Sequence, residues 1–280
     1  MMLPQNFYKE LGSALNSIRN IEGYLTEREM KFLFLAGSCP TAEGEVLEIG
    51  SFKGKSTVIL ARANILSGGD KIVAVDPLTS PSITDPDLKG KKSGLEEFQN
   101  NIQSAGIKEA VEFHQMFSYE LSAAWQRDIR LLWIDGDHTY SGTKKDFDMF
   151  SKFLSNGAII ALHDVLARFD GPIRVFMEDI LLSDRFGQAG IWGSVGWGQY
   201  LDDKEIARRY TDKKLILYSK LSRLIPFCVF QDNRGQSDIA GKLRYKLWRA
   251  MVPHAELSPS EWLNKVVRSE TSHCKGFTKA

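Results

Sequence analysis

The stretch of residues 45–57 constrains the fold more than any other part of this sequence. Val46, Leu47 and Ile49 form a short apolar run of the kind that fills a parallel strand covered on both faces. Gly50 and Gly54 follow, and Ser56 opens an apolar helix. Glycine lets a backbone turn and approach a ligand, and the unpaired amides at a helix start attract anionic groups. We predict a strand, a turn and a helix that hold a nucleotide-like ligand.

Spacing separates three kinds of nucleotide site. A P-loop needs four residues between its first glycine and Gly-Lys-Ser/Thr, but only residues 51–53 lie between Gly50 and Gly54. A dinucleotide site requires Gly-x-Gly-x-x-Gly, and Phe52 stands at its second glycine. The segment resembles instead the cofactor turn of class I methyltransferases, with Glu48 as its acidic residue. The resemblance implies S-adenosylmethionine as cofactor, held by Glu48, Gly50, Ser51, Gly54 and Ser56.

Strands and helices alternate along the chain, which predicts a doubly wound α/β fold with a mostly parallel sheet of seven strands. The predicted strands are residues 45–49, 71–75, 111–114, 129–134 and 158–162, and an antiparallel hairpin over residues 190–201 closes the sheet. The predicted helices include residues 7–21, a helix from the capping box at Thr26, and residues 140–154, which end at Asn156-Gly157. Residues 77–92 are either a mobile lid or a surface excursion.

Two further residues are candidates for the cofactor pocket. Asp76 ends the second strand, where a carboxylate can accept hydrogen bonds from both ribose hydroxyls, and Pro77 favours a strand end over a cap. Ser118 follows the third strand, where relatives contact the adenine, although it can also be the N-cap of the next helix.

Size and charge suggest one large domain with an appendage. The chain has 280 residues, of which 43% are hydrophobic, enough to bury a full core. Residues 202–280 carry a net charge of +7 and residues 1–201 carry −6. We predict a helical cover over residues 1–40, a cofactor-binding domain over residues 41–201, and a basic, helical extension over residues 202–280.

The location and partners are predicted from what the sequence lacks. There is no apolar leader or membrane-length stretch, and three cysteines without metal-like spacing indicate thiols in a reducing, cytoplasmic compartment. No nucleic-acid recognition motif is present, so no nucleic-acid partner is expected. Residues 213–230 and 242–251 mix apolar with basic side chains. They suit docking on an anionic membrane or partner, or packing on the core or across a homo-oligomer.

Polar side chains follow two strands at the predicted carboxyl edge of the sheet. Asp135 and His138 come after the fourth strand, and His163 and Asp164 after the fifth. Such groups are costly to place together unless they bind a cation or move protons. The pattern Asp-Gly-Asp-His-x-Tyr with Gly-Ala-Ile-Ile-x-x-His-Asp resembles the O-methyltransferases of sugars, macrolide sugars and catechols, over residues 20–201.

That resemblance implies a site. Asp135, which also borders the cofactor, would hold Mg²⁺ with His163 and Asp164. An imidazole at His163 departs from the family, and it favours a softer ion such as Mn²⁺, lies beside the metal, or indicates that no metal is used. His138 stands where relatives place a lysine that removes the acceptor proton, and an imidazole can serve as that base. Asp135, His138 and His163 are therefore the predicted catalytic residues.

The predicted activity is methyl transfer from S-adenosylmethionine to a hydroxyl of a sugar or another small-molecule or glycan acceptor, with possible help from a divalent metal. Two other classes remain open. One is a P-loop-like nucleotide-binding protein or phosphotransferase, and the other is a cofactor-binding module without catalysis.

Overall fold

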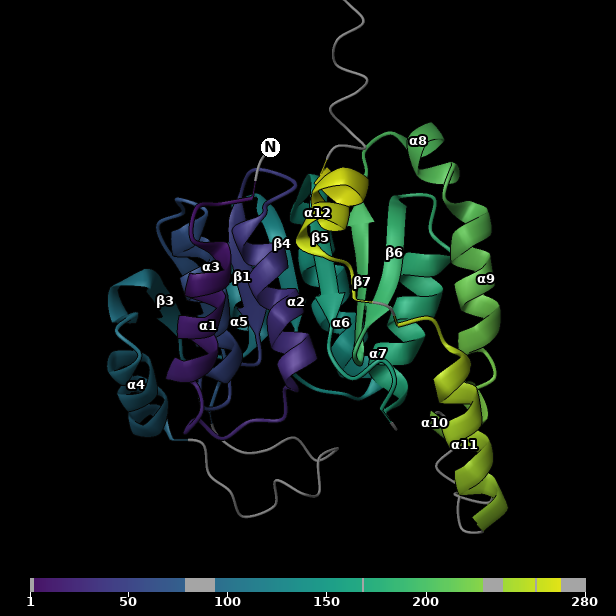
Figure 1. Cartoon of the computed structure of the whole chain (residues 1–280), viewed down its shortest axis with the longest axis horizontal. Coiled ribbons are helices and arrows are strands. Elements are labelled where there is room, and N and C mark those ends of the chain that lie inside the picture. Colours follow the sequence, from purple (N-terminus) through teal and green to yellow (C-terminus); the bar gives the residue numbers. More distant parts are fainter. Residues whose placement is uncertain (1–2, 79–93, 168, 229–238, 255, 268–280) are drawn as a thin grey trace, which may run out of the picture.

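The protein is built on one twisted sheet. The computed structural model describes residues 3–78, 94–167, 169–228, 239–254 and 256–267 (Figure 1). Within these residues seven strands form a sheet in the order β3-β2-β1-β4-β5-β7-β6, in which β7 runs antiparallel to both neighbours. The strands are β1 (Glu45–Ile49), β2 (Ile72–Val75), β3 (Val111–His114), β4 (Ile129–Ile134), β5 (Leu154–Leu162), β6 (Phe186–Trp192) and β7 (Val195–Tyr200).

Helices cover both faces of this sheet, which confirms the predicted doubly wound fold. One face packs against α1 (Phe7–Ser17), α2 (Glu27–Ser38), α3 (Lys55–Leu66), α4 (Leu95–Ser104), α12 (Pro259–Trp262) and the π-helix η6 (Leu263–Val267). The other packs against α5 (Ser118–Ala124), α6 (Tyr140–Phe150), α7 (Asp170–Val175), the π-helix η4 (Phe176–Leu181), α9 (Thr211–Leu221), α10 (Ile225–Cys228) and α11 (Ile239–Met251). Short elements are α8 (Lys204–Arg208) and the 3₁₀ helices η2 (Lys108–Ala110) and η3 (Ser151–Phe153).

The apolar runs of the central strands explain the two-sided core. In β4, Leu131 and Trp133 pack into the first cluster, whereas Leu132 and Ile134 pack into the second. All four side chains are at most 3% exposed. Because successive side chains of a strand point to opposite faces, a continuous apolar run buries both faces of the sheet.

The boundary between α6 and β5 differs from the prediction. The helix predicted over residues 140–154 ends at Phe150, and β5 begins at Leu154 and not at residue 158. The predicted helix stop at Asn156-Gly157 is instead an irregularity inside the strand, where the register against β4 shifts and Gly157 has φ of 88°. An Asn-Gly pair supports a bulge as well as a helix end, because glycine tolerates this positive φ.

The C-terminal residues return to the sheet. Trp262 is fully buried, and its indole N–H donates to the Cys39 carbonyl. Its ring centroid lies 5.3 Å from that of Trp197 and 6.0 Å from that of Phe32.

Most of the predicted loop over residues 77–92, and residues 229–230 of the predicted amphipathic tail, lie outside the described residues. Among the residues that the structure describes, no helix has the length and apolar content needed to cross a membrane.

Candidate active site

The glycine turn after β1 lies directly against the end of β4. Gly50 has φ of 88°, and a Cβ there would approach the Asp135 carbonyl oxygen to 2.2 Å, so another side chain would force the two strand ends apart. Gly54, with φ of 85°, is the N-cap of α3. The turn predicted to hold the cofactor is therefore in backbone contact with a predicted catalytic residue.

Glu48 lies beneath this turn and is fully buried. One oxygen accepts hydrogen bonds from the hydroxyls of Thr57 at 2.6 Å and Ser51 at 3.1 Å. Burial raises the pKa of Glu48 to about 7, although hydrogen bonds from Ser56, Thr57 and Ser51 oppose the shift. The predicted cofactor roles of Glu48, Ser51 and Ser56 thus involve residues that already bond to one another.

Asp76 binds the same turn from the end of β2. One carboxylate oxygen accepts from the backbone amides of Ser51 and Phe52, both at 2.8 Å, and the other accepts from the amide of Leu78 at 2.8 Å. A carboxylate has about four acceptor positions, so Asp76 can bind further donors such as ribose hydroxyls. Asp76 is predicted to bind the ribose, and in the structure it also fixes the conformation of the turn through the amides of Ser51 and Phe52.

Ser118 lies in the first turn of α5, one residue after the N-cap position at Phe117. The N-cap alternative for Ser118 is therefore wrong. Its hydroxyl donates to Asp146 of α6, and burial raises the pKa of Asp146 to about 6. The contact between Ser118 and the adenine stays a prediction.

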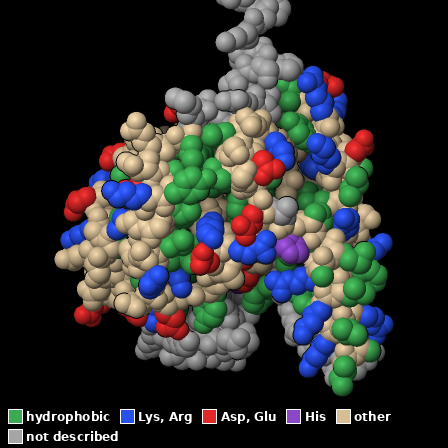
Figure 2. Space-filling model, in the orientation of Figure 1, with side chains coloured by type: hydrophobic (Ala, Val, Ile, Leu, Met, Phe, Trp, Pro, Cys, Tyr) green, Lys and Arg blue, Asp and Glu red, His purple; other side chains and the backbone are tan. Residues whose placement is uncertain are grey.

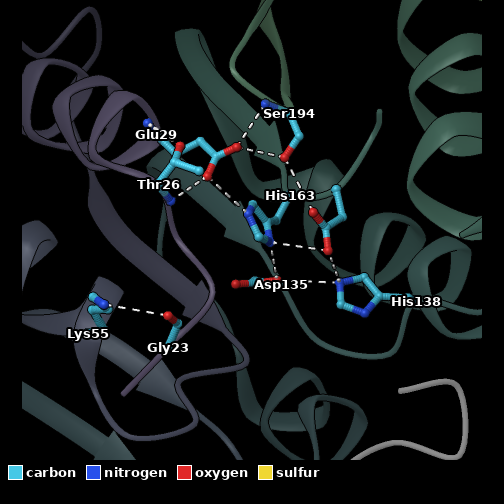
Figure 3. Close-up of polar contacts among 9 residues, drawn as sticks. Gly23, Thr26, Glu29, Lys55, Asp135, His138, His163 and Ser194 are labelled. Carbon is cyan, nitrogen blue, oxygen red and sulfur yellow. Dashed lines mark hydrogen bonds and ion pairs between the residues drawn. The ribbon is translucent and has the colours of Figure 1, made fainter. Parts of the chain in front are cut away.

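The polar residues after β4 and β5 converge at the carboxyl edge of the sheet (Figure 3). Nδ1 of His163 lies 3.0 Å from Oδ1 of Asp135, and Nε2 of His138 lies 3.4 Å from the same oxygen. The second carboxylate, Asp164, is 3.7 Å from His163 and 3.9 Å from His138. All four predicted residues therefore meet, because parallel neighbouring strands end at the same edge.

The sequence did not reveal two other members of the cluster, Glu29 and Ser194. Glu29 of α2 closes the predicted capping box with one oxygen, which accepts from the Thr26 amide, and this oxygen also lies 3.6 Å from Nε2 of His163. Its other oxygen accepts from the backbone and the hydroxyl of Ser194, at the tip of the β6–β7 hairpin. In the sequence, the one signal that Glu29 faces inward is its place just before the apolar run of residues 32–35, which is expected to be buried.

The charges of the cluster stabilise one another. Burial opposes a charge on His163, yet Asp135 and Glu29 on its two sides raise its pKa well above the usual value. Burial likewise opposes a charge on Glu29, but His163 and Ser194 lower its pKa to about 2. His138 has a raised pKa, because Asp135 and Asp164 outweigh its burial. The site holds alternating positive and negative groups.

Part of the chain matches a known family model. Residues 47–165, from β1 to the residue after Asp164, match the family model described as a methyltransferase domain. This chain therefore contains a segment that is similar to a methyltransferase domain. The matched range contains the glycine turn, Asp76, Ser118 and the four predicted residues at the ends of β4 and β5.

Solved structures with a TM-score above 0.5 share the fold of this chain. A protein from Corynebacterium glutamicum has a TM-score of 0.51 and 13% identity, with 70% of this chain and 91% of that chain covered. The O-methyltransferase NovP has a TM-score of 0.52 and 12% identity, with 63% and 81% covered. An O-methyltransferase from Bacillus cereus, solved in complex with SAH, has 22% identity, a TM-score of 0.47, and 68% and 90% covered.

The donor set does not fit the Mg²⁺ that the family resemblance implies. The atoms that lie within 4.8 Å of one another belong to Asp135, His138 and His163, a group that includes His138 and leaves out Asp164. Magnesium prefers oxygen ligands, and this group offers one carboxylate and two imidazoles. A softer ion such as Mn²⁺ accepts imidazole more readily, and Glu29 could then accept the other ring N–H of His163.

Replacing Glu48 is expected to stabilise this protein at high pH. The folded-state pKa of about 7 lies above the reference value of 4.5, so the stability that Glu48 contributes is present below pH 4.5 and is lost as pH rises to 7. Glu48→Gln removes this loss and should raise the free energy of unfolding at pH 8 by up to about 3 kcal/mol. Urea denaturation at pH 5 and pH 8 measures it, with the exposed Glu43→Gln as control. Equal pH dependence in both variants would contradict the assignment.

Asp76→Ala is expected to weaken binding of S-adenosylmethionine. The substitution removes the predicted acceptor for the ribose and the carboxylate that binds the turn amides of Ser51 and Phe52. A charged hydrogen bond is worth about 1.5 to 3 kcal/mol, so the dissociation constant should rise roughly 10- to 150-fold. Calorimetry measures the change, with the exposed Asp70→Ala at the other end of β2 as control. Unchanged affinity in Asp76→Ala would remove Asp76 from the cofactor site.

Proposed function

We propose that this protein transfers a methyl group from S-adenosylmethionine to a hydroxyl of a sugar or another small molecule. The observation that carries the proposal is Nε2 of His138. This atom is buried, has no hydrogen-bond partner among the described residues, and faces the carboxylates of Asp135 and Asp164. A nitrogen so placed can accept a proton, and the carboxylates stabilise the imidazolium that forms.

The reaction needs one proton transfer and one displacement. The acceptor hydroxyl gives its proton to Nε2 of His138, and its oxygen forms a bond to the methyl carbon while the carbon–sulfur bond of the sulfonium breaks. The bonding electrons go to sulfur, which leaves as a neutral thioether. The chain contributes alignment, because Gly50 and Asp135 bring the cofactor turn and the base to one point.

His138 is held for this task by its neighbours. Its ring stacks on Phe169, with centroids 4.5 Å apart and planes 13° apart, and its carbonyl accepts from the amide of Gly171 at the start of α7. Its side chain is 12% exposed. The ring is therefore fixed in orientation, yet it keeps limited access to an acceptor at the edge of the sheet.

A divalent ion would be held by Asp135, His138 and His163. Such an ion lowers the pKa of a bound hydroxyl when present. If it occupied Nε2 of His138, that nitrogen could not take a proton, so the base role and the ligand role of His138 exclude each other. We propose the base role.

A phosphate-binding function is less consistent with the turn. In a P-loop the backbone amides point at phosphate, whereas the amides of Ser51 and Phe52 donate to Asp76 here. A carboxylate at this point repels phosphate and suits hydroxyl donors.

Methyl transfer is tested with cofactor labelled in its methyl group and a panel of sugars, glycosylated metabolites and phenols, with and without chelator. We expect label in a hydroxyl-bearing acceptor, retained in chelator. Activity restored only by Mn²⁺ would assign His138 to the metal. Cofactor binding without transfer to any acceptor would favour a non-catalytic module, and retention of a nucleoside triphosphate instead would favour the phosphate-binding class.

A further inference from the structure

Helix α11 exposes a row of large apolar side chains to solvent. Ile239, Leu243, Leu247 and Met251 recur every four residues, and their exposed fractions are 87%, 66%, 54% and 45%. Residues four apart lie one above another on a helix, so the four form one continuous stripe. Neighbouring α9 adds Leu215 and Ile216, which are 45% and 59% exposed. We call these six residues the apolar edge, and Figure 2 shows hydrophobic side chains among basic ones over both helices.

The orientation of α11 is fixed by its opposite face. Tyr245 is buried, and its hydroxyl donates to the carbonyl of Leu166 at 2.6 Å. Trp248 lies under the guanidinium of Arg223, 4.8 Å from the ring centroid. The helix therefore cannot turn its apolar stripe inward without breaking these contacts. The packing of α11 on the protein thus keeps the stripe exposed.

A basic flank runs beside the stripe. Helix α11 contains Lys242, Arg244, Lys246 and Arg249 and has no acidic residue. Three of these, Lys242, Lys246 and Arg249, line an open hollow of about 420 Å³ together with Tyr245 and Ala167. Ala167 stands three residues after Asp164, so the hollow lies beside the loop that leaves the active site.

We propose that the apolar edge docks on an anionic lipid surface. An outward apolar stripe with a flank of Lys and Arg is the pattern of helices that lie in the plane of a membrane interface. Each basic residue near such a surface adds attraction to anionic lipid. The hollow beside Ala167 would then receive an anionic head group, and an acceptor carried on a lipid would meet the site at the membrane.

Charge argues against a second copy of this chain as the occupant. Two copies paired through α11 would bring eight basic side chains together, with no acidic residue on either helix to compensate. Like charges held close in an interface weaken association. An anionic lipid surface would bury the apolar stripe and pair with the charges of the basic flank at the same time.

Vesicle flotation of the full chain tests the proposal without an acceptor or a methyl-transfer assay, so its result is independent of the proposed function. We expect binding to vesicles that contain phosphatidylserine and none to vesicles of phosphatidylcholine alone. Added salt should weaken the binding, because the Debye length falls from about 10 Å at 0.1 M to about 3 Å at 1 M.

Two double variants separate the contributions. Leu243→Ser with Leu247→Ser removes the middle of the stripe, and Lys242→Glu with Lys246→Glu reverses the flank. Each should lower the bound fraction at least about tenfold. The matched control is Ile65→Ser, which removes an apolar side chain that is 49% exposed on α3, and it should bind like the wild type. Circular dichroism and thermal unfolding establish that each variant folds.

Three results would overturn the proposal. The first is a wild-type protein that does not float with anionic vesicles. The second is folded α11 variants that bind as well as the wild type. The third is light scattering that finds a dimer in the wild type and a monomer in the Leu243→Ser, Leu247→Ser variant, which would assign the apolar edge to a second copy.

Discussion

Asp135→Ala should lower the turnover number about a thousandfold while the protein stays folded. Oδ1 of Asp135 lies 3.4 Å from Nε2 of His138 and 3.0 Å from Nδ1 of His163, so one substitution removes the anion shared by both rings. Loss of the carboxylate partner of a catalytic histidine costs about 10⁴-fold in a serine protease, and a smaller loss is expected here because Asp164 remains beside His138. Single-turnover transfer at saturating cofactor measures the change.

The matched control is Asp148→Ala. Asp148 is a carboxylate of the same β4–α6 unit, but it is half exposed and pairs with Lys144 on the surface. This variant should keep the wild-type rate within about a factor of two, since exposed ion pairs contribute little. Asp135→Ala activity within tenfold of the wild type would show that the cluster has another organising anion.

His138→Ala should lower the turnover number about a hundredfold without weakening cofactor binding. General-base catalysis contributes roughly 10²- to 10⁴-fold. Cofactor binding should not change, because among the described residues His138 pairs with Asp135, Asp164 and Gly171, none of which belongs to the cofactor turn. A base must be unprotonated to act. Because Asp135 and Asp164 raise the pKa of His138, the wild-type rate should fall as pH drops, with a midpoint above 6.5.

The pH profile makes the second prediction specific. In His138→Ala this fall should disappear, and His114→Ala, which removes a histidine at the end of β3 paired with Glu112, should retain it. If His138→Ala keeps both the rate and the pH profile of the wild type, proton removal belongs to another group, and His163 is the other imidazole of the cluster.

Much of the fold follows from local sequence. Apolar runs bounded by glycine and polar residues predicted the central strands β1, β2, β4 and β5, because a strand buried on both faces admits few polar side chains. The glycine-rich hairpin was predicted with a first strand that is too short, since β6 begins at Phe186 and not at residue 190. The junction of α6 and β5 did not follow, since Asn156-Gly157 serves a helix end and a bulge equally well. Whether Asn156-Gly157 ends a helix or forms a bulge depends on the register of β5 against β4, and this register cannot be read from the local sequence.

The meeting of four site residues was predictable, because parallel neighbouring strands end at the same edge of a sheet. Asp135, His138, His163 and Asp164 end neighbouring strands, and their meeting follows from the topology. Glu29 and Ser194 were not predictable, because they lie 165 residues apart in the chain and meet only in the folded structure. Asp76 was predicted as a ligand, but its bonds to the turn amides depend on a backbone conformation that sequence pattern does not specify.

The contact among Glu29, His163 and Ser194 makes the site a late product of folding. Three segments must be in place for it: α2 near the start of the chain, the end of β5, and the tip of the last hairpin. Contacts of such sequence separation form after local ones, because the chain must close long loops first. A nascent chain that has emerged only as far as β5 lacks Ser194, so the buried carboxylate and imidazole would meet before their hydroxyl partner exists. The complete contact therefore requires that the polypeptide has been synthesised past residue 194.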